Sequence, residues 1–235
     1  MAASLRQLRA VKSSGSSGTR GGYPPTVEDR LPSGLWLELV RDADPAVRAK
    51  ELSAAGLRVS RYAADPYPEL PRRLDECASL LVAECAAADV SAAYAEVPPA
   101  DPSTTVVPMR RYPRPAQGIC TGEETTGLLL VLITPKTEAD SQTLRDWADF
   151  IHLRWIAAAG VPGYRMITPY EHVEAGSPRY SHVYEMVTDD PRRTFESMRP
   201  RVADLLGGTE SQAFRDWAWH PALRIDYVNT FRRTG

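Results

Sequence analysis

Histidine and tyrosine side chains gather in the second half of this 235-residue sequence. His152 lies in a helix-like run, and His182 lies in a strand-like run between Tyr180 and Tyr184. An imidazole takes or gives a proton near neutral pH, and a phenol can donate a hydrogen bond to a carbonyl or a developing enolate. These residue types indicate acid–base chemistry on a small oxygenated molecule. The candidate catalytic residues are His152, His182 and Tyr184.

Ring side chains recur at every second position of the strand-like runs. Successive side chains of a strand point to opposite faces, so 163–172 places its even-numbered residues on one face, and 222–233 does the same for its odd-numbered residues. If these faces coincide, they form an apolar wall with a few convergent polar groups, which is typical of a small-molecule pocket. The candidate substrate-binding residues are Trp155, Tyr164, Met166, Tyr170, His172, Tyr227 and Asn229.

Each candidate also has a structural interpretation. His152 lies beside the apolar stripe of its helix, where a histidine can simply bond a backbone carbonyl. His182 in mid-strand is equally a core histidine with its own hydrogen-bond partner. Tyrosines and Trp155 at buried positions are aromatic core by default. Both interpretations stay open for every histidine and tyrosine in this set.

The elements that must position these residues occur twice in the same order. Each half reads as a strand, a helix, two strands, a helix and a strand, which is the ferredoxin-like β-α-β-β-α-β unit. The first half has strands at 34–40, 56–65, 77–85 and 104–114 and helices at 44–56 and 86–97. The second has strands at 127–133, 163–172, 179–187 and 222–233 and helices at 139–159 and 190–206.

One ferredoxin-like sheet has a bare face, and two such units can pack sheet to sheet and cover both. We therefore expect an α+β fold in which two tandem units form, within one chain, the α/β barrel that single-unit proteins build as dimers. The expected parts are a flexible Ser/Gly-rich tail at 1–30, a first half at 31–118 and a second half at 119–235.

The first half serves as an internal control for the second. Aligning LLVAEC with SHVYEM places Ala83 near Tyr184, and aligning GLRVSRY with GYRMITP places Leu57 at Tyr164. A core needs only shape and apolarity, so polar rings added to one copy alone point to another purpose. The sequence predicts one functional pocket, in the second half, and a purely structural role for the first half.

The run DFIHLRWIAAAGVPGYRMITPYEHV, followed by PRYSHVYEMVTDDP, resembles the dimeric α/β-barrel superfamily. Within it, the run is similar to EthD-like proteins and to the polyketide-cyclase and antibiotic-biosynthesis-monooxygenase groups. The likeness covers 127–233, and the first half matches in layout only. It implies small, often aromatic or polyketide-like substrates held between sheet and helices. Proteins with different chemistries share these motifs, so the reaction stays open.

We expect a cofactor-independent enzyme of secondary metabolism or aromatic catabolism. It would abstract a proton next to a carbonyl and so drive cyclisation, isomerisation or elimination. One alternative is cofactor-free oxygenation, in which the substrate's own enolate reacts with O₂. Another is haem binding with one of the histidines as axial ligand. The last is a non-catalytic ligand-binding protein.

Composition narrows the partners. A net charge of −2 gives no electrostatic basis for binding nucleic acid or an anionic membrane, and no apolar run approaches a membrane span. The scattered Cys77, Cys85 and Cys120 fit a reducing cytoplasm. There is no signal-peptide core, no nucleotide-binding glycine motif, no GxSxG and no known metal-ligand spacing. We expect a cytoplasmic protein without bound metal. Duplication removes the need to dimerise for barrel closure but does not forbid a homodimer.

Overall fold

The computed structural model describes residues 31–65, 67, 69–87, 89–118 and 123–235. The predicted tail at 1–30 and Cys120 lie outside these residues. The first part of the chain contains β1 (Gly34–Val40), α2 (Pro45–Ala54), β2 (Arg58–Asp65), β3 (Ser79–Cys85), α3 (Val90–Ala95) and β4 (Thr104–Arg111). Every element predicted for this part is present, with ends that differ by a few residues.

The second part begins with the short strand β5 (Gln117–Gly118), which the sequence did not predict. It continues with β6 (Gly127–Pro135), η1 (Glu138–Asp140), α4 (Ser141–Trp147), the π-helical turn η2 (Ala148–His152), α5 (Leu153–Ala158) and β7 (Tyr164–His172). It ends with β8 (Tyr180–Met186), α6 (Pro191–Leu205), α7 (Gln212–Ala218) and β9 (Leu223–Arg233). Helix α7 was also missed. None of the described helices combines the length and apolarity needed to cross a membrane.

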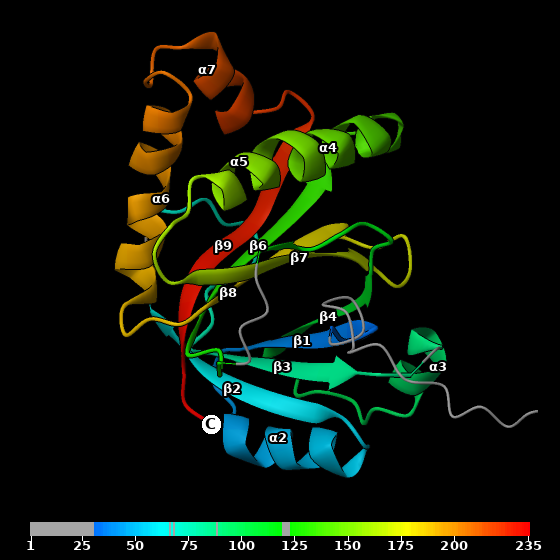
Figure 1. The fold of residues 1–235 in the computed structure, drawn as a ribbon. Coiled ribbons are helices and arrows are strands. Elements are labelled where there is room, and N and C mark those ends of the chain that lie inside the picture. Colours follow the sequence, from blue (N-terminus) through cyan, green and yellow to red (C-terminus); the bar gives the residue numbers. More distant parts are fainter. Residues whose placement is uncertain (1–30, 66, 68, 88, 119–122) are drawn as a thin grey trace, which may run out of the picture.

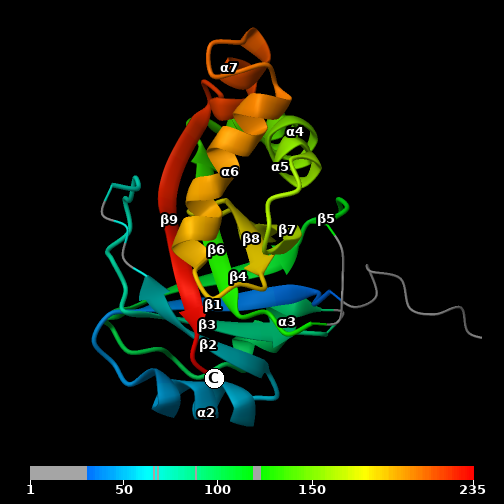
Figure 2. The same ribbon diagram turned by 60° about the vertical axis from the view of Figure 1, so that its left-hand side comes forward.

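The strands form one antiparallel sheet that closes on itself, so the predicted α+β class is confirmed. The strand order is β4-β1-β3-β2-β9-β6-β8-β7-β5. A further pairing of β4 with β7, from Met109 opposite His172 to Arg111 opposite Tyr170, joins the first strand of this order to the next-to-last one and closes the sheet. Figures 1 and 2 show the strands wrapping around a common interior. Closure leaves β4 and β7 paired rather than exposed as sheet edges.

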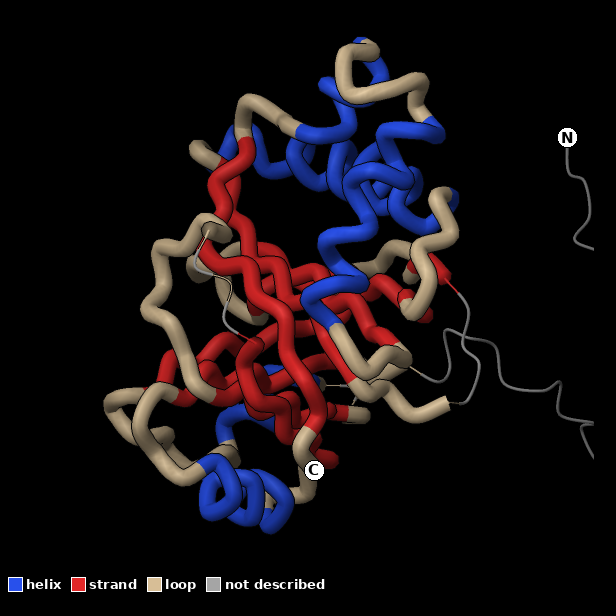
Figure 3. Tube along the Cα trace, turned by 90° about the vertical axis from the view of Figure 1, so that its left-hand side faces the viewer, coloured by secondary structure: helices blue, strands red, loops and turns tan. Residues whose placement is uncertain are grey.

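Strand alternation separates an inner core from an outer one, as β6 illustrates. Leu128, Leu130 and Leu132 pack inside the barrel. Leu129 faces outward and packs under the helices, together with Ile156 and Trp217. Helices α4 to α7 lie together beyond β6, β8 and β9, while α2 and α3 lie at the other end of the molecule (Figures 1 and 3). The space between sheet and helices therefore belongs to the second part of the chain.

Helix ends follow the predicted capping. The Asp44 carboxylate accepts a hydrogen bond from the Ala46 N–H at the start of α2. Asp190 caps α6 in the same way through the Arg193 N–H. Each cap is followed by a proline, which suits the first helical turn. Ser211 caps the unpredicted α7 through the Phe214 N–H.

The predicted helix at 139–159 differs from a regular helix in its middle. Regular spacing would bury Ile151 and Trp155, but Ile151 is 37% exposed, and the buried positions are Leu153 and Ile156. The π turn adds one residue to the helical ladder, so the buried stripe moves by one position beyond it. The same shift buries Asp149, which the sequence placed on no functional face.

Candidate functional site

A cavity of about 550 Å³ lies between the outer face of the sheet and the helices that cover it. Leu129, Val131 and Ile133 of β6 and Ile225 and Val228 of β9 form its apolar floor. Side chains of α4, η2, α6 and α7 form the remaining walls. The volume and the mostly apolar lining suit one hydrophobic small molecule.

Two polar side chains reach this cavity from β8. His182 and Tyr184 line it, with residue exposures of 5% and 2%. Neither the His182 ring nitrogens nor the Tyr184 hydroxyl makes a hydrogen bond to any described residue. Buried polar groups in folded proteins almost always have a partner, so these two are available to a ligand. Burial raises the pKa of the Tyr184 phenol, which keeps it a hydrogen-bond donor.

His152 occupies a more constrained place in the same wall. Its Nδ1 lies 3.0 Å from the Trp217 carbonyl, and its ring lies against the indoles of Trp147 and Trp217, with centroids 4.9 and 5.1 Å away. Burial lowers the pKa of His152, with the Trp217 carbonyl opposing this. His152 is therefore a neutral imidazole with a fixed ring.

Asp149 lies on the other side of His182. Its Oδ1 is 3.8 Å from His182 Nε2, and its Oδ2 is 3.3 Å from Arg114 Nη1. Burial raises the pKa of Asp149 to about 6, against the charges of Arg114 and Arg145. Burial lowers the pKa of His182 to about 3, and His152 acts in the same direction. At neutral pH the pair is therefore a carboxylate beside a neutral imidazole.

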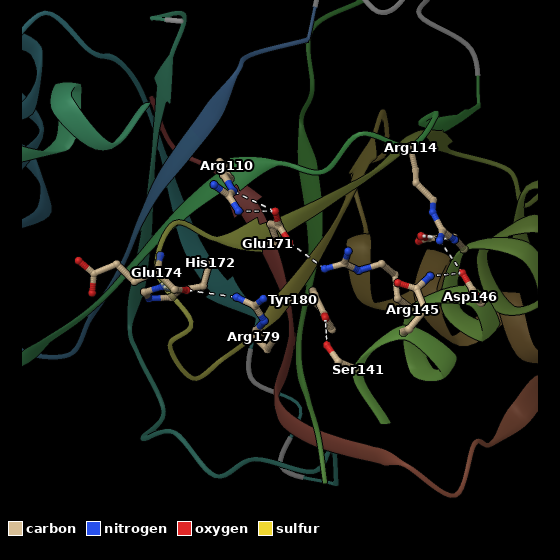
Figure 4. Close-up of polar contacts among 12 residues, drawn as sticks. Arg110, Arg114, Ser141, Arg145, Asp146, Glu171, His172, Glu174, Arg179 and Tyr180 are labelled. Atoms are coloured by element: carbon tan, nitrogen blue, oxygen red, sulfur yellow. Dashed lines mark hydrogen bonds and ion pairs between the residues drawn. The ribbon is translucent and has the colours of Figure 1, made fainter. Parts of the chain in front are cut away.

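A set of arginines and acids fixes the strand ends beside Asp149 (Figure 4). Glu171 on β7 receives Arg110 Nε at 2.9 Å and Arg145 Nη2 at 2.7 Å. The Arg145 guanidinium also lies over the rings of Tyr112 and Tyr180, 3.4 and 4.4 Å from their centroids. These contacts tie α4 to β7 and β8 and hold the wall that carries His182.

The predicted wall of coinciding strand faces is wrong. Val131 of β6 pairs with His182 on one side and with Val228 on the other, so the outward face of β9 carries Val228 rather than Tyr227. A bulge shifts the register of β9 between Ile225 and Tyr227, so Ile225 faces the cavity while Tyr227 faces the barrel interior. Tyr227 and Asn229 point into the barrel, where the Tyr227 hydroxyl contacts Cys77 Sγ at 3.2 Å.

Strand β7 departs from the predicted alternation in its own way. A bulge lies between Tyr164 and Met166. Tyr170 packs inside the barrel with the inner core. Tyr164 packs among the helix-side residues 5.7 Å from the Tyr184 ring, and its hydroxyl points to Met198 Sδ at 3.9 Å. Tyr164, Met166 and Tyr170 are all absent from the lining of the main cavity.

The remaining predicted residues also lie away from the cavity lining. Trp155 is partly buried against the helix-side core. His172 lies at the end of β7, where its Nδ1 contacts the backbone of Glu174. Of the ten predicted site residues, the structure brings His152, His182 and Tyr184 together around the cavity.

Sequence reasoning missed several residues of the cavity. Trp217 and Trp219 come from the region of α7, whose signal was Ser211 as a cap followed by Phe214 and Trp217 at helical spacing. Phe195, Met198 and Arg199 come from the inner face of α6. The first part of the chain adds Tyr67, Leu70 and Pro71, so it contributes side chains to the cavity wall.

Cofactor binding is tested by the donors available. The described residues contain no group of three or more His, Cys, Asp or Glu side chains placed to hold a metal ion. A haem iron would need an imidazole nitrogen free to ligate it. His152 is held by Trp217, whereas the His182 nitrogens make no hydrogen bond to a described residue. His182 is therefore the cavity histidine that could serve the haem alternative.

No known protein family matches the sequence, and no curated protein matches it. Solved structures do. An anthrone oxidase-like protein superposes with a TM-score of 0.51 at 13% identity, covering 86% of this chain and 92% of that one. A mutant chlorite dismutase from Candidatus Nitrospira defluvii superposes with a TM-score of 0.51 at 8% identity, covering 87% and 92%. The chain therefore shares its fold with these two proteins, which agrees with the resemblance stated from its sequence.

Proposed function

We propose that this chain is an enzyme that removes a proton from a flat, hydrophobic, oxygenated aromatic molecule, whose anion then reacts with O₂ without a bound cofactor. The observation that carries the proposal is the pair His182 and Tyr184. Both face a mostly apolar cavity of about 550 Å³ with polar groups that make no hydrogen bond to a described residue. Fused-ring products of polyketide or aromatic metabolism are small enough for this volume and apolar enough for this lining.

The two groups have complementary roles. The neutral imidazole of His182 accepts a proton from a ring methylene conjugated to a carbonyl. The Tyr184 phenol donates a hydrogen bond to the carbonyl oxygen as it gains negative charge. Apolar walls strengthen both interactions because little water screens them.

The oxygenation balances without an external reductant. The carbanion gives electrons to O₂, and a carbon–oxygen bond forms to give a hydroperoxide. The hydroperoxide then loses its remaining C–H proton and its terminal oxygen as water. A methylene thus becomes a ketone, one oxygen atom enters the product and the other leaves as water. The shared fold with an anthrone oxidase-like protein favours this chemistry over a specific cyclisation.

A second candidate uses the same site. Proton removal by His182 with Tyr184 holding the enolate is enough for cyclisation, isomerisation or elimination, since neither group takes part in the oxygen step. The two functions differ in one measurable way, because only the first consumes O₂.

The organisation of the fold is part of the proposal. We infer that 31–118 and 119–235 are tandem ferredoxin-like units, the first degenerate. Supporting this, β4-β1-β3-β2 in one half has the same relative order as β9-β6-β8-β7 in the other. The cavity lies on the helix-covered face of the second unit alone.

The test uses anthrone as probe, because it has one acidic methylene opposite a ketone. We expect wild-type protein to form anthraquinone faster than buffer, with one O₂ consumed per product. His182→Gln should lower the rate about a hundredfold, within the usual range for losing a general base. Turnover of the probe without O₂ would favour the second candidate.

The visible spectrum of the purified protein is measured alongside. A Soret band would show haem and contradict the cofactor-free mechanism. Failure of wild-type protein to bind anthrone or anthraquinone would contradict the proposed substrate class.

A further inference from the structure

Asp149 is buried beside His182 but does not line the main cavity. It lines a separate void of about 10 Å³, and His182 borders both spaces. The imidazole therefore stands between the substrate space and a carboxylate. Such an arrangement differs from a surface acid that happens to lie near a histidine, because Asp149 is 6% exposed.

The π turn is what points Asp149 inward. In a regular helix the residues after Trp147 would continue the apolar stripe through Ile151. The extra residue in the turn instead buries Asp149 and leaves Phe150 and Ile151 at 56% and 37% exposure. A π turn is less stable than regular helix and is often found at functional sites. Here it exchanges a buried isoleucine for a buried acid.

The Asp149 carboxylate lies beside an arginine, but one of its oxygens accepts no hydrogen bond from a described residue. Arg114, from the segment between β4 and β5, lies 3.3 Å from Asp149 Oδ2 and also binds Asp146 (Figure 4). Asp149 Oδ2 and Arg114 Nη1 are nevertheless buried without a hydrogen bond among the described residues. An acid kept in this state costs stability, which favours a role other than packing.

We propose that Asp149 is a positioning residue for His182: it orients the imidazole through Nε2 and stabilises the imidazolium formed when His182 takes the substrate's proton. This inference rests on the proposed function and explains how its proposed base, His182, can hold the proton that it removes. A carboxylate facing Nε2 favours the tautomer with its proton there and leaves Nδ1 to accept. The other charged or titratable groups around the pair are His152, Arg114, Arg145, Asp146, Tyr112, Tyr170, Tyr180 and Tyr184.

The inference explains how so weak a base could act. Burial holds the pKa of His182 near 3 even with Asp149 beside it, so the imidazole keeps the substrate's proton only if its attraction to the carboxylate grows. An adjacent carboxylate favours the charged form of a histidine, typically by one to three pKa units. Substrate that fills the cavity excludes water and strengthens this attraction.

The test uses alizarin, a dihydroxyanthraquinone whose colour changes when its phenol ionises. It resembles the proposed product and has no methylene to oxidise. We expect Asp149→Asn to raise the pH midpoint of the colour change of bound alizarin by about one unit, a tenfold loss of phenolate at fixed pH. Asp149→Glu should recover part of the shift, because it restores the charge.

Asp146→Asn is the matched control. Asp146 also binds Arg114, but its side chain is 45% exposed and does not contact His182. We expect this variant to keep the wild-type midpoint. Circular dichroism of each variant checks folding, and Asp149→Glu keeps the test decisive if the asparagine variant misfolds.

The outcomes separate two failures. If wild-type protein does not bind alizarin, the proposed substrate class is wrong, and this role falls with it. If alizarin binds and ionises equally in wild type, Asp149→Asn and Asp149→Glu, the proposed function stands and the role of Asp149 is refuted.

Discussion

The imidazole of His152 lies parallel to the indole of Trp217, with 5.1 Å between ring centroids and 8° between ring planes. Hydrogen bonds join the two residues in both directions. His152 Nδ1 donates to the Trp217 carbonyl at 3.0 Å, and Trp217 Nε1 donates to the His152 carbonyl at 3.1 Å. His152 ends the π turn and Trp217 lies in α7. The pair therefore connects the π turn η2 to helix α7, which the sequence did not predict.

Trp217→Phe should reduce stability through this link. The change keeps most of the ring contact and removes the N–H that satisfies the His152 carbonyl. We expect the free energy of unfolding to fall by about 1–2 kcal/mol, the usual cost of a lost buried hydrogen bond. Urea denaturation followed by circular dichroism measures it. Trp219→Phe, at a residue that is 53% exposed, should change stability by less than about 0.5 kcal/mol.

Tyr184→Phe should separate function from stability. The Tyr184 hydroxyl has no partner among the described residues, so its removal should leave the free energy of unfolding within about 0.5 kcal/mol of wild type. Oxidation of anthrone should slow at least tenfold, because the donor to the developing oxyanion is lost. Stability comes from denaturation curves and rate from O₂ uptake.

Tyr227→Phe is the matched opposite. The Tyr227 hydroxyl contacts Cys77 Sγ at 3.2 Å and receives Asn229 Nδ2 at 3.2 Å inside the barrel. Its loss should cost about 1–2 kcal/mol of stability and leave turnover unchanged. If Tyr227→Phe slowed turnover while Tyr184→Phe did not, the substrate would bind inside the barrel and the site would be misassigned.

Stability should depend on pH with opposing contributions from His182 and Asp149. The pKa of His182 is about 3 in the folded state and 6.5 unfolded, so stability falls as pH drops below 6.5. The pKa of Asp149 is about 6 folded and 3.8 unfolded, so its proton uptake favours folding as pH drops through 6. The free energy of unfolding should therefore fall less steeply with decreasing pH in His182→Gln than in wild type, and more steeply in Asp149→Asn.

The size of the histidine effect follows from linkage. Between pH 6.5 and 5, the buried neutral His182 lowers the free energy of unfolding by about 2 kcal/mol, at about 1.4 kcal/mol per pH unit. Denaturation at pH 7.5 and pH 5 measures the difference for each variant. Some acid sensitivity remains in His182→Gln, because burial also lowers the pKa of His152 and His172. Equal slopes in all three proteins would mean that neither group is buried as described.

Local sequence patterns were sufficient for most of the helices and strands and for three residues that line the cavity, His152, His182 and Tyr184. Capped helices such as that after Asp190 and apolar runs such as 127–133 carry local signals, so their positions could be predicted. His182 and Tyr184 were found because they alternate along one strand. That periodicity depends only on the strand itself and needs no knowledge of its neighbours.

What failed depends on relations between segments. Tyr227 and Val228 lie on opposite faces of β9, and only its register against β6 decides which faces the cavity. Likewise, helical spacing read along the chain assumes that no residue is inserted. The π turn inserts one, so Asp149 is buried where regular spacing would bury Ile151. Tyr67 could not be found at all, because nothing local brings a loop of the first half against α6.

That loop yields the last prediction. The Tyr67 ring meets Phe195 edge to face at 6.1 Å, and the Arg192 guanidinium lies 4.3 Å from its centroid, at the rim of the cavity. Tyr67→Ala should remove one ring surface from the substrate and raise KM for anthrone about fivefold, since aromatic contacts are worth about 1 kcal/mol. We expect kcat to stay unchanged, because Tyr67 touches neither His182 nor Tyr184. Tyr67→Phe keeps the ring and should match wild type. If both variants kept the wild-type KM, the first half would be scaffold alone, and the cavity would bind its substrate entirely within the second half.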